Sequence, residues 1–219
     1  MANAVVILSG CGFMDGAEVQ ESVLTLYFLE RFGIEARCFA PDRPQFHVIN
    51  HLTGEATGEE RNVLVESARI ARGAIRDLAQ AKMADHDVLV LPGGFGVAKN
   101  LSDFATQGAH ATVDSELVRL VDEAISLRRP IVAICIAPAV LAAALSKLGK
   151  AAQVTIGDDA ETATAIASLG SKHHRCAVEG IAVDEENLII STPAYMLGPG
   201  PKGVGAGIEA AIAKLMDWL

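Results

Sequence analysis

Short apolar runs alternate along this chain with longer segments of helical periodicity. Residues 4–8, 88–91 and 131–134 are almost wholly aliphatic and predict buried strands, and residues 34–40 predict another. Helices are predicted at about 17–33, 114–128, 137–148 and 206–218, and a hairpin at 181–183 and 188–191. Strands that are apolar on both sides and alternate with helices indicate an α/β fold, with a mostly parallel sheet covered on both faces.

The same alternation runs through all 219 residues, so we expect residues 1–219 to form a single domain. Residues 42–84 fit the rhythm less well, because they are polar and contain one helical pattern at 61–72. We interpret them as an insertion beside the sheet.

Composition excludes several classes of function. A hydrophobic content of 51% argues against disorder, and a net charge of −9 without a basic block argues against nucleic acid and anionic membranes as partners. Residues 131–145 are apolar but too short to span a membrane, and Pro138 interrupts them. The start of the chain has no basic segment before its apolar run, so we expect a cytoplasmic protein.

The four cysteines and six histidines show no metal-binding pattern. No C-x-x-C pair occurs, which argues against a zinc ribbon. His173 and His174 are adjacent, and neighbouring residues of a strand or loop point apart. We therefore expect no metal site.

The glycine-rich turn after the first predicted strand resembles a dinucleotide fingerprint only in part. Gly10 and Gly12 match G-x-G-x-x-G, but Asp15 stands where the third glycine belongs. A carboxylate there would oppose a pyrophosphate at the helix N-terminus, so we favour a tight turn and expect no dinucleotide.

Cys135 follows the strand at 131–134 and precedes a helix within one or two residues. Strand–turn–helix with small flanking residues is typical of a nucleophile elbow, which lifts a side chain above the sheet. The helix N-terminus favours a thiolate, so we expect Cys135 to be exposed in a cleft and reactive. Cys11, Cys38 and Cys176 fit buried core cysteines, with Cys38 inside a strand and Cys176 opening one.

Two other segments reach the same edge of the sheet. Gly93 and Gly94 follow the strand at 88–91, and their N–H groups suit an anion or an oxyanion. Glu18 and Glu21 begin the first helix, and Glu21 belongs near its apolar side. A half-buried Glu21 would keep its proton and could donate it to a cysteine sulfur.

These motifs together resemble the ThiJ/PfpI branch of the class I glutamine amidotransferase-like superfamily, and within it the enhancing-lycopene-biosynthesis (ElbB) family. The resemblance covers nearly the whole chain, including the insertion. Its stretches are residues 8–12, 15–16, 38–42, 48–55, 61–64, 92–96, 98–101, 135–138 and 192–196.

The resemblance implies a flavodoxin-like three-layer sandwich that is usually a homodimer, with Cys135 as nucleophile and Glu21 as the glutamate of the first helix. The N–H groups of Gly94 and Ile136 would form the oxyanion hole, with Gly93 beside them. Members of the family are described as cofactor-independent glyoxalases, with a link to isoprenoid biosynthesis. The histidine of true amidotransferases and peptidases is missing, since Ile136 and, as aligned, Gly157 hold its two places.

The resulting hypothesis is a glyoxalase that converts a small aldehyde, glyoxal or methylglyoxal, to a 2-hydroxy acid through a hemithioacetal on Cys135. Two alternatives use the same cysteine: a redox-sensing or regulatory binding protein, and a degenerate amidotransferase subunit. The missing histidine argues against glutaminase and peptidase activity. His51 and Glu18 remain candidates for a second proton carrier beside Glu21.

Overall fold

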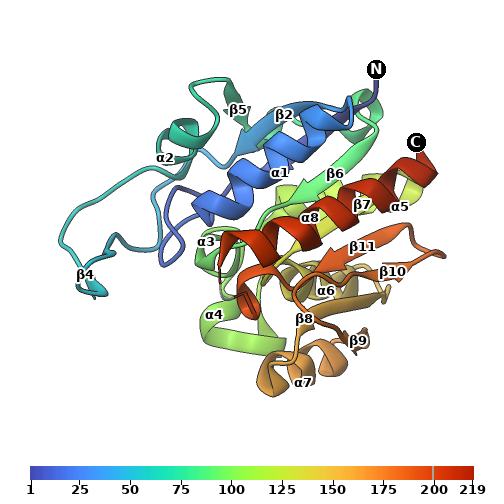
Figure 1. Cartoon of the computed structure of the whole chain (residues 1–219). Helices are drawn as coiled ribbons and strands as arrows, with labels where there is room; N and C mark the ends of the chain where they lie inside the picture. The colour runs from blue at the N-terminus through green and yellow to red at the C-terminus, as the bar shows by residue number, and fades with distance from the viewer. Residues whose placement is uncertain (199) are drawn as a thin grey trace.

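The computed structural model describes residues 1–198 and 200–219, and a seven-stranded sheet runs through its centre (Figure 1). The strand order is β10-β11-β7-β6-β1-β2-β5, and every pairing is parallel except that of β10 with β11. The strands are β1 (Asn3–Ile7), β2 (Glu35–Ala40), β5 (Ile75–Asp77), β6 (Val88–Leu91), β7 (Ile131–Ile134), β10 (Ala182–Asp184) and β11 (Ile189–Thr192).

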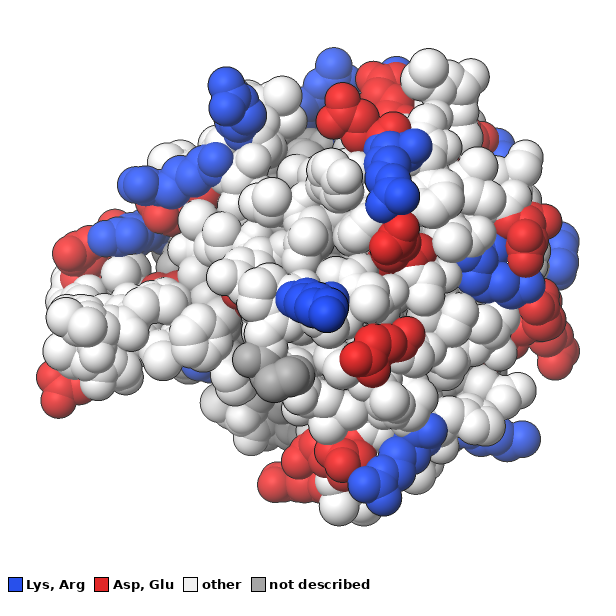
Figure 2. Space-filling model, in the orientation of Figure 1, with Lys and Arg blue, Asp and Glu red and all other residues white. Residues whose placement is uncertain are grey.

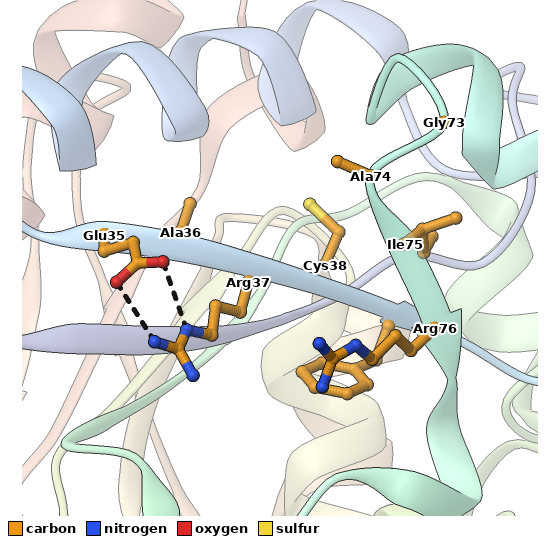
Figure 3. A pocket seen from close by; sticks show the side chains of 9 residues that line it. Glu35, Ala36, Arg37, Cys38, Gly73, Ala74, Ile75 and Arg76 are labelled. Atoms are coloured by element: carbon orange, nitrogen blue, oxygen red, sulfur yellow. Dashed lines mark hydrogen bonds and ion pairs between the residues drawn. The ribbon is translucent and has the colours of Figure 1, made fainter.

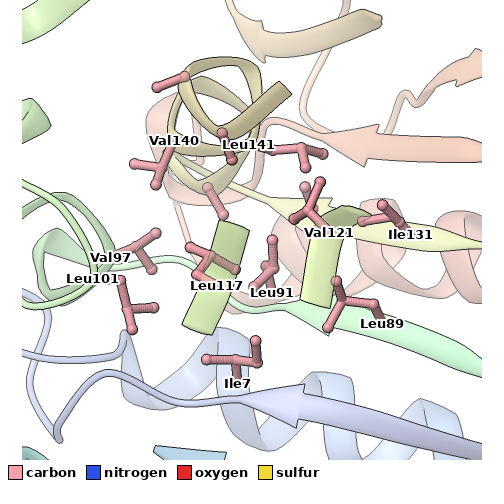
Figure 4. Packing of buried hydrophobic residues seen from close by; sticks show 14 of the residues in the cluster. Ile7, Leu89, Leu91, Val97, Leu101, Leu117, Val121, Ile131, Val140 and Leu141 are labelled. Carbon is pink, nitrogen blue, oxygen red and sulfur yellow. The ribbon is translucent and has the colours of Figure 1, made fainter. Parts of the chain in front are cut away.

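Helices cover both faces of this sheet, so the predicted three-layer, flavodoxin-like α/β architecture is confirmed. One layer contains α1 (Val19–Arg31) and α8 (Pro201–Leu215), which pack against each other. The opposite layer contains α5 (Ser115–Ser126) and α6 (Ala137–Lys147). Alternate residues of β1 point into the two layers, because side chains of a strand alternate between its faces: Val5 joins one core and Val6 the other. Figure 4 shows Leu117 beside Leu91 and Val121 beside Ile131, where α5 packs against the sheet.

The insertion contributes to the sheet as well as lying beside it. It contains the two-stranded β3 (Ile49–Asn50) and β4 (Glu55–Ala56), and then α2 (Val63–Ile70). Its β5 pairs with β2 and forms one edge of the main sheet, which the polar sequence did not predict. Figure 1 shows the β3–β4 arm reaching away from the sheet.

A second small sheet was missed by the sequence patterns. It pairs β8 (Gln153–Gly157) with β9 (Lys172–Arg175), and α7 (Ala160–Ser168) connects them. Two short helices, α3 (Phe95–Lys99) and α4 (Phe104–Gln107), follow β6. Cys176 follows β9, so the prediction that it opens a strand is wrong.

The buried face of α1 is not its most apolar row. Val19, Val23 and Tyr27 are exposed, while Phe28 is buried. The buried face also carries Glu21 and Thr25. This orientation turns a carboxylate into the interior at the start of the helix.

Charges are mixed on the face drawn in Figure 2, where Lys and Arg stand singly among Asp and Glu. In the described part of the chain, no helix is both long and apolar enough to cross a membrane.

Candidate active site

The carboxyl ends of four adjacent strands, β11, β7, β6 and β1, meet at one edge of the sheet. The chain leaves β1 toward β2 on one side, while β6 lies on the other side, so the strand order reverses between β1 and β6. Ligands of open α/β sheets bind at such a switch point. The predicted residues Cys135, Gly94 and Glu21 come from three of the segments that follow these strands.

Cys135 occupies a sharp turn between β7 and α6. Its φ is +63°, in the left-handed region that non-glycine residues rarely adopt, and its N–H donates to the Thr192 carbonyl of β11 at 2.9 Å. Ile136 is the N-cap of α6, and Pro138 stands in the first turn. The local geometry is therefore the strained strand–helix elbow that the sequence predicts.

Two backbone N–H groups converge on the Cys135 sulfur. They belong to Gly94 and Ile136, and both donate to Sγ. Gly94 has a φ of +98°, and a Cβ there would come within 2.3 Å of the Glu18 nitrogen, so only glycine fits. If a substrate carbon were bonded to Sγ, an oxygen on that carbon could accept from the N–H groups of Gly94 and Ile136, which follow β6 and β7.

Glu21 is fully buried beside the sulfur and is held through both of its oxygens. Oε2 accepts from the Gly93 N–H at 3.1 Å and Oε1 accepts from the Tyr195 N–H at 3.0 Å. The N–H of Gly93 is thus occupied by Glu21 rather than by the sulfur. A Cβ on Gly93 would come within 2.4 Å of the Cys135 Cβ and 2.5 Å of Oε2, so glycine lets the Cys135 and Glu21 side chains approach each other.

The thiol and the carboxyl share a side-chain hydrogen bond, which raises the pKa of Cys135 and lowers the pKa of Glu21. Burial raises the pKa of Glu21 to about 7, and the Tyr195 and Gly93 N–H groups and the thiol hydrogen bond only partly oppose this. Burial and the Glu21 charge raise the pKa of Cys135 well above its usual value, while the Gly94 and Ile136 N–H groups lower it. The Cys135 thiol therefore keeps its proton at neutral pH, while the Glu21 carboxyl, with a pKa of about 7, is partly protonated.

The expectation of an exposed Cys135 thiolate is wrong. Its residue surface is 7% exposed, and burial outweighs the stabilisation that the helix N-terminus and the two N–H groups give to a charged sulfur. Cys11, expected to be a core cysteine, is half-buried, and burial and Glu66 raise its pKa. Cys38 is buried in β2, as predicted.

Tyr195 and Glu18 complete the surroundings of Glu21. Tyr195, which follows β11, holds Glu21 through its backbone and Gln20 through its hydroxyl. No residue pattern pointed to this role, although Tyr195 lies in one of the resemblance stretches. Glu18 is the half-buried N-cap of α1, its Oε2 accepts from the Glu21 N–H at 2.6 Å, and burial raises its pKa.

No histidine occupies either place that the superfamily uses. Ile136 directly follows the cysteine. Gly157 ends β8 with a φ of +96°, and a Cβ there would lie 2.6 Å from Leu197, which fills the space of a side chain. His51 instead lies in the arm, where its ring packs against Phe13 and its Nε2 is 3.7 Å from Asp15. The structure therefore does not bring His51 into the Cys135–Glu21 pair.

Side chains of the protein occupy the space beside the glycine turn that follows β1. Asp15 is buried, and its Oδ2 accepts from the Ile49 N–H of the arm at 2.7 Å. A Cβ on Gly12 would come within 2.6 Å of His51. Asp15 thus ties the turn to the insertion.

A cavity of about 480 Å³ lies elsewhere, along β2 and β5 (Figure 3). Glu35 and Arg37 form an ion pair there, and Cys38 lies on the opposite side of the strand from Arg37. None of its lining residues belongs to the Cys135 site. Within the described residues, no group of three or more His, Cys, Asp or Glu side chains could hold a metal ion.

An α/β sandwich with a cysteine elbow, two N–H donors at its sulfur and a buried glutamate defines a class I glutamine amidotransferase-like protein. A model of the DJ-1/PfpI family matches residues 11–195. The chain belongs to the DJ-1/PfpI family, which includes cysteine-dependent enzymes.

Named relatives are similar over nearly the whole chain. The mitochondrial ES1 protein homolog of Rattus norvegicus is 44% identical over 99% of this chain and 84% of its own length. The mitochondrial glutamine amidotransferase-like class 1 domain-containing protein 3 of Homo sapiens is 44% identical over 99% and 83%. The crystal structure of an isoprenoid biosynthesis protein with an amidotransferase-like domain from Ehrlichia chaffeensis is 40% identical, with a TM-score of 0.92 over 99% of this chain and 100% of that one.

These names correct one expectation. The first residues of the chain predicted a cytoplasmic protein, but both of these relatives are named mitochondrial, which contradicts that prediction. The absence of a basic segment before an apolar run says nothing about which compartment a folded domain works in.

Proposed function

We propose that this chain is a cofactor-independent glyoxalase that converts glyoxal or methylglyoxal to a 2-hydroxy acid. The observation that carries the proposal is the buried Cys135–Glu21 pair, which holds a transferable proton beside two N–H donors. The reaction needs no external oxidant, because one carbon of the substrate is oxidised while its neighbour is reduced.

In the proposed first step, Sγ of Cys135 adds to the aldehyde carbon while Glu21 takes the thiol proton. The developing oxyanion accepts from the Gly94 and Ile136 N–H groups, and Glu21 returns the proton to that oxygen to give a hemithioacetal. A carboxyl group whose pKa is about 7 suits both directions of transfer at neutral pH.

In the second step, the Glu21 carboxylate takes the C–H proton of the former aldehyde carbon and delivers it to the neighbouring carbon through an enediol. The product is a thioester of the 2-hydroxy acid on Cys135. Water then hydrolyses the thioester, releases the acid and restores the thiol, so that one water is consumed for each aldehyde.

We further propose that the chain falls in the ElbB group of the family. The motif stretches of the sequence support this, as does its similarity to a protein named for isoprenoid biosynthesis.

The two alternative functions, a redox sensor and an amidotransferase subunit, have less support. A redox sensor works best with an exposed, low-pKa thiolate, whereas Cys135 is buried with a raised pKa. An amidotransferase subunit lacks its histidine, and Leu197 fills the space at Gly157.

The test is to incubate the purified protein with glyoxal and methylglyoxal and to measure 2-hydroxy acid formation. Glu21→Gln keeps the size of the side chain but cannot carry the proton, so turnover should fall by about 10²–10⁴-fold. Glu30→Gln, an exposed position on the same helix, is the matched control and should keep full turnover. Wild-type turnover in Glu21→Gln would refute the mechanism.

A further inference from the structure

The carboxyl of Glu21 is tied to η4 (Ala194–Met196), the short helical turn that follows β11. Its Oε1 accepts from the Tyr195 N–H at 3.0 Å, across 174 positions of the sequence. Burial raises the pKa of Glu21 to about 7, and among the groups that oppose this rise the Tyr195 N–H has the largest effect. The position of this single N–H therefore governs how easily Glu21 gives up its proton.

The backbone that aims this N–H has an uncommon conformation. Ala194 has a φ of +43°, in the left-handed region that residues with a side chain rarely adopt. It is fully buried and packs in the same core as Cys135. Strain of this kind persists only where the surrounding contacts hold it. The direction of the Tyr195 N–H thus depends on what fixes η4.

The side chain of Tyr195 supplies one such contact. Its hydroxyl donates to Oε1 of Gln20, which directly precedes Glu21 in the first turn of α1. Burial and the charges of Glu18 and Glu21 raise the pKa of the Tyr195 hydroxyl, so it keeps the proton that it donates. One residue of η4 therefore holds two adjacent residues of α1, one through its backbone and one through its side chain.

We propose that Tyr195 is a positioning residue of the Cys135 site, and that its hydroxyl bond to Gln20 holds its N–H on Glu21. In this arrangement Glu21 releases a proton more readily than its burial alone would allow. The inference rests on the proposed function of Glu21 as the proton carrier, and it names the groups that adjust this carrier. Tyr195 acts through Glu21 and needs no contact with the substrate.

The other groups that act on Glu21 are unchanged when Tyr195 or Gln20 is replaced by a neutral residue. The charge of Glu18 raises the pKa of Glu21, and the hydrogen bond from the Cys135 thiol lowers it. Helix α8 packs against both α1 and η4. Its charged side chains are either exposed or paired with other surface residues: Lys202, Glu209 and Lys214. Neutral substitutions at the two positions therefore test the hydrogen bond and not a charge.

The first experiment follows the Glu21 carboxyl directly, by a ¹³C NMR titration of protein labelled at the glutamate side-chain carboxyls. The Glu21 signal is the one that is lost in Glu21→Gln. Tyr195→Phe removes only the hydroxyl and should move the titration midpoint of Glu21 to higher pH. We expect its proton affinity to rise about 3–10-fold, because a weakened N–H bond stabilises the carboxylate less.

The matched control is Tyr27→Phe, which removes the same group from an exposed position of α1. Its Glu21 midpoint should equal that of the wild type. An unmoved midpoint in Tyr195→Phe, or an equal shift in Tyr27→Phe, overturns the proposal.

A second comparison tests whether Tyr195 and Gln20 act through one bond. Gln20→Leu removes the acceptor at an exposed helix position and should move the Glu21 midpoint about as far as Tyr195→Phe does. The double variant should move it no further than either single change, because both changes break the same hydrogen bond. Shifts that add in the double variant would show two separate effects and overturn the proposal.

The pH dependence of turnover links the titration to the reaction. Glu21 takes the thiol proton in the first proposed step, so kcat for glyoxal should rise with pH as Glu21 loses its proton. In Tyr195→Phe this rising limb should move to higher pH by the same amount as the NMR midpoint, and in Tyr27→Phe it should stay. An NMR shift without any glyoxal turnover leaves the role of Tyr195 intact and removes the glyoxalase function. Turnover with an unmoved limb and an unmoved midpoint removes the role of Tyr195 alone.

Discussion

Cys11 and Cys135 follow two strands of the same sheet, β1 and β7, and emerge at the same edge, yet their surroundings differ. Cys11 is half-buried in a glycine turn, and the carboxylates Glu66 and Asp15 act on it from a distance. Cys135 is buried in a strained turn, with N–H groups from two segments and the Glu21 carboxyl at its sulfur.

The difference shows that the exposure of a thiol and the arrangement of polar groups around it are separate properties. Cys11 is easier to reach, and only charged groups at a distance act on it. Cys135 is harder to reach, but the Glu21 carboxyl and the N–H groups of Gly94 and Ile136 lie at its sulfur.

The largest effect is expected from replacing the two cysteines. Cys135→Ser should lower glyoxal turnover by at least about 10³-fold, because a hydroxyl is a much weaker nucleophile than a thiol. Cys11→Ser should leave turnover within twofold of the wild type, as measured by 2-hydroxy acid formation. A large loss of glyoxal turnover in Cys11→Ser would contradict the assignment of Cys135 as the nucleophile.

The next effect is on the pH dependence of stability. The pKa of Glu21 is about 7 in the folded chain against 4.5 for an ordinary glutamate, so between these pH values the folded state binds more protons than the unfolded state. The free energy of unfolding should therefore fall as pH rises from 4.5 through 7, by about 3 kcal/mol.

Urea unfolding at several pH values should show this fall in the wild type and in Glu30→Gln. Glu21→Gln has no titrating carboxyl at that position, so its profile should be flatter by the same amount. Parallel profiles for wild type and Glu21→Gln would show that the carboxyl is not held with a raised pKa.

A glycine substitution tests how tightly the Cys135 region is packed. Gly93→Ala places a methyl group within 2.4 Å of the Cys135 Cβ, at a buried position, and should lower the free energy of unfolding by about 1–3 kcal/mol. Gly58→Ala in the arm, where a Cβ meets nothing within 4 Å, should change it by less than about 0.5 kcal/mol. Denaturant melts of both variants check this, and equal stabilities would contradict the close approach of Cys135 and Glu21.

The smallest effect concerns thiol labelling. A bulky disulfide reagent at neutral pH should modify Cys11 before Cys135, because Cys11 is the more accessible. Glu21→Gln removes the neighbouring charge that helps to raise the Cys135 pKa, so Cys135 should be labelled several-fold faster at pH 8. Mass spectrometry of the two peptides distinguishes them, and the Cys11 rate should not move.

Much of the architecture could be predicted from the residues alone. The runs 88–91 and 131–134 coincide with β6 and β7, because apolar residues of this kind are stable as short strands only inside a covered sheet. Asp114 is the N-cap of α5, and its side chain accepts from the N–H groups of Glu116 and Leu117, as the residue type at this position predicts. Residues 172–175 are Lys, His, His and Arg, and such a polar strand gives no pattern, so β9 was missed.

The elbow and the glycine loop were in the sequence, because local turn chemistry decides them, whereas Glu21 was preferred to Glu18 through the family resemblance. The sequence placed Cys135 at a helix N-terminus and so predicted a thiolate, since it records the N–H dipoles but not the burial that opposes them. That burial comes from segments far along the chain, such as Ala194 and Tyr195 after β11, which pack in the same core as Cys135. The state of the proton between Cys135 and Glu21 depends on desolvation, which is a property of how distant segments pack and which only the tertiary structure decides.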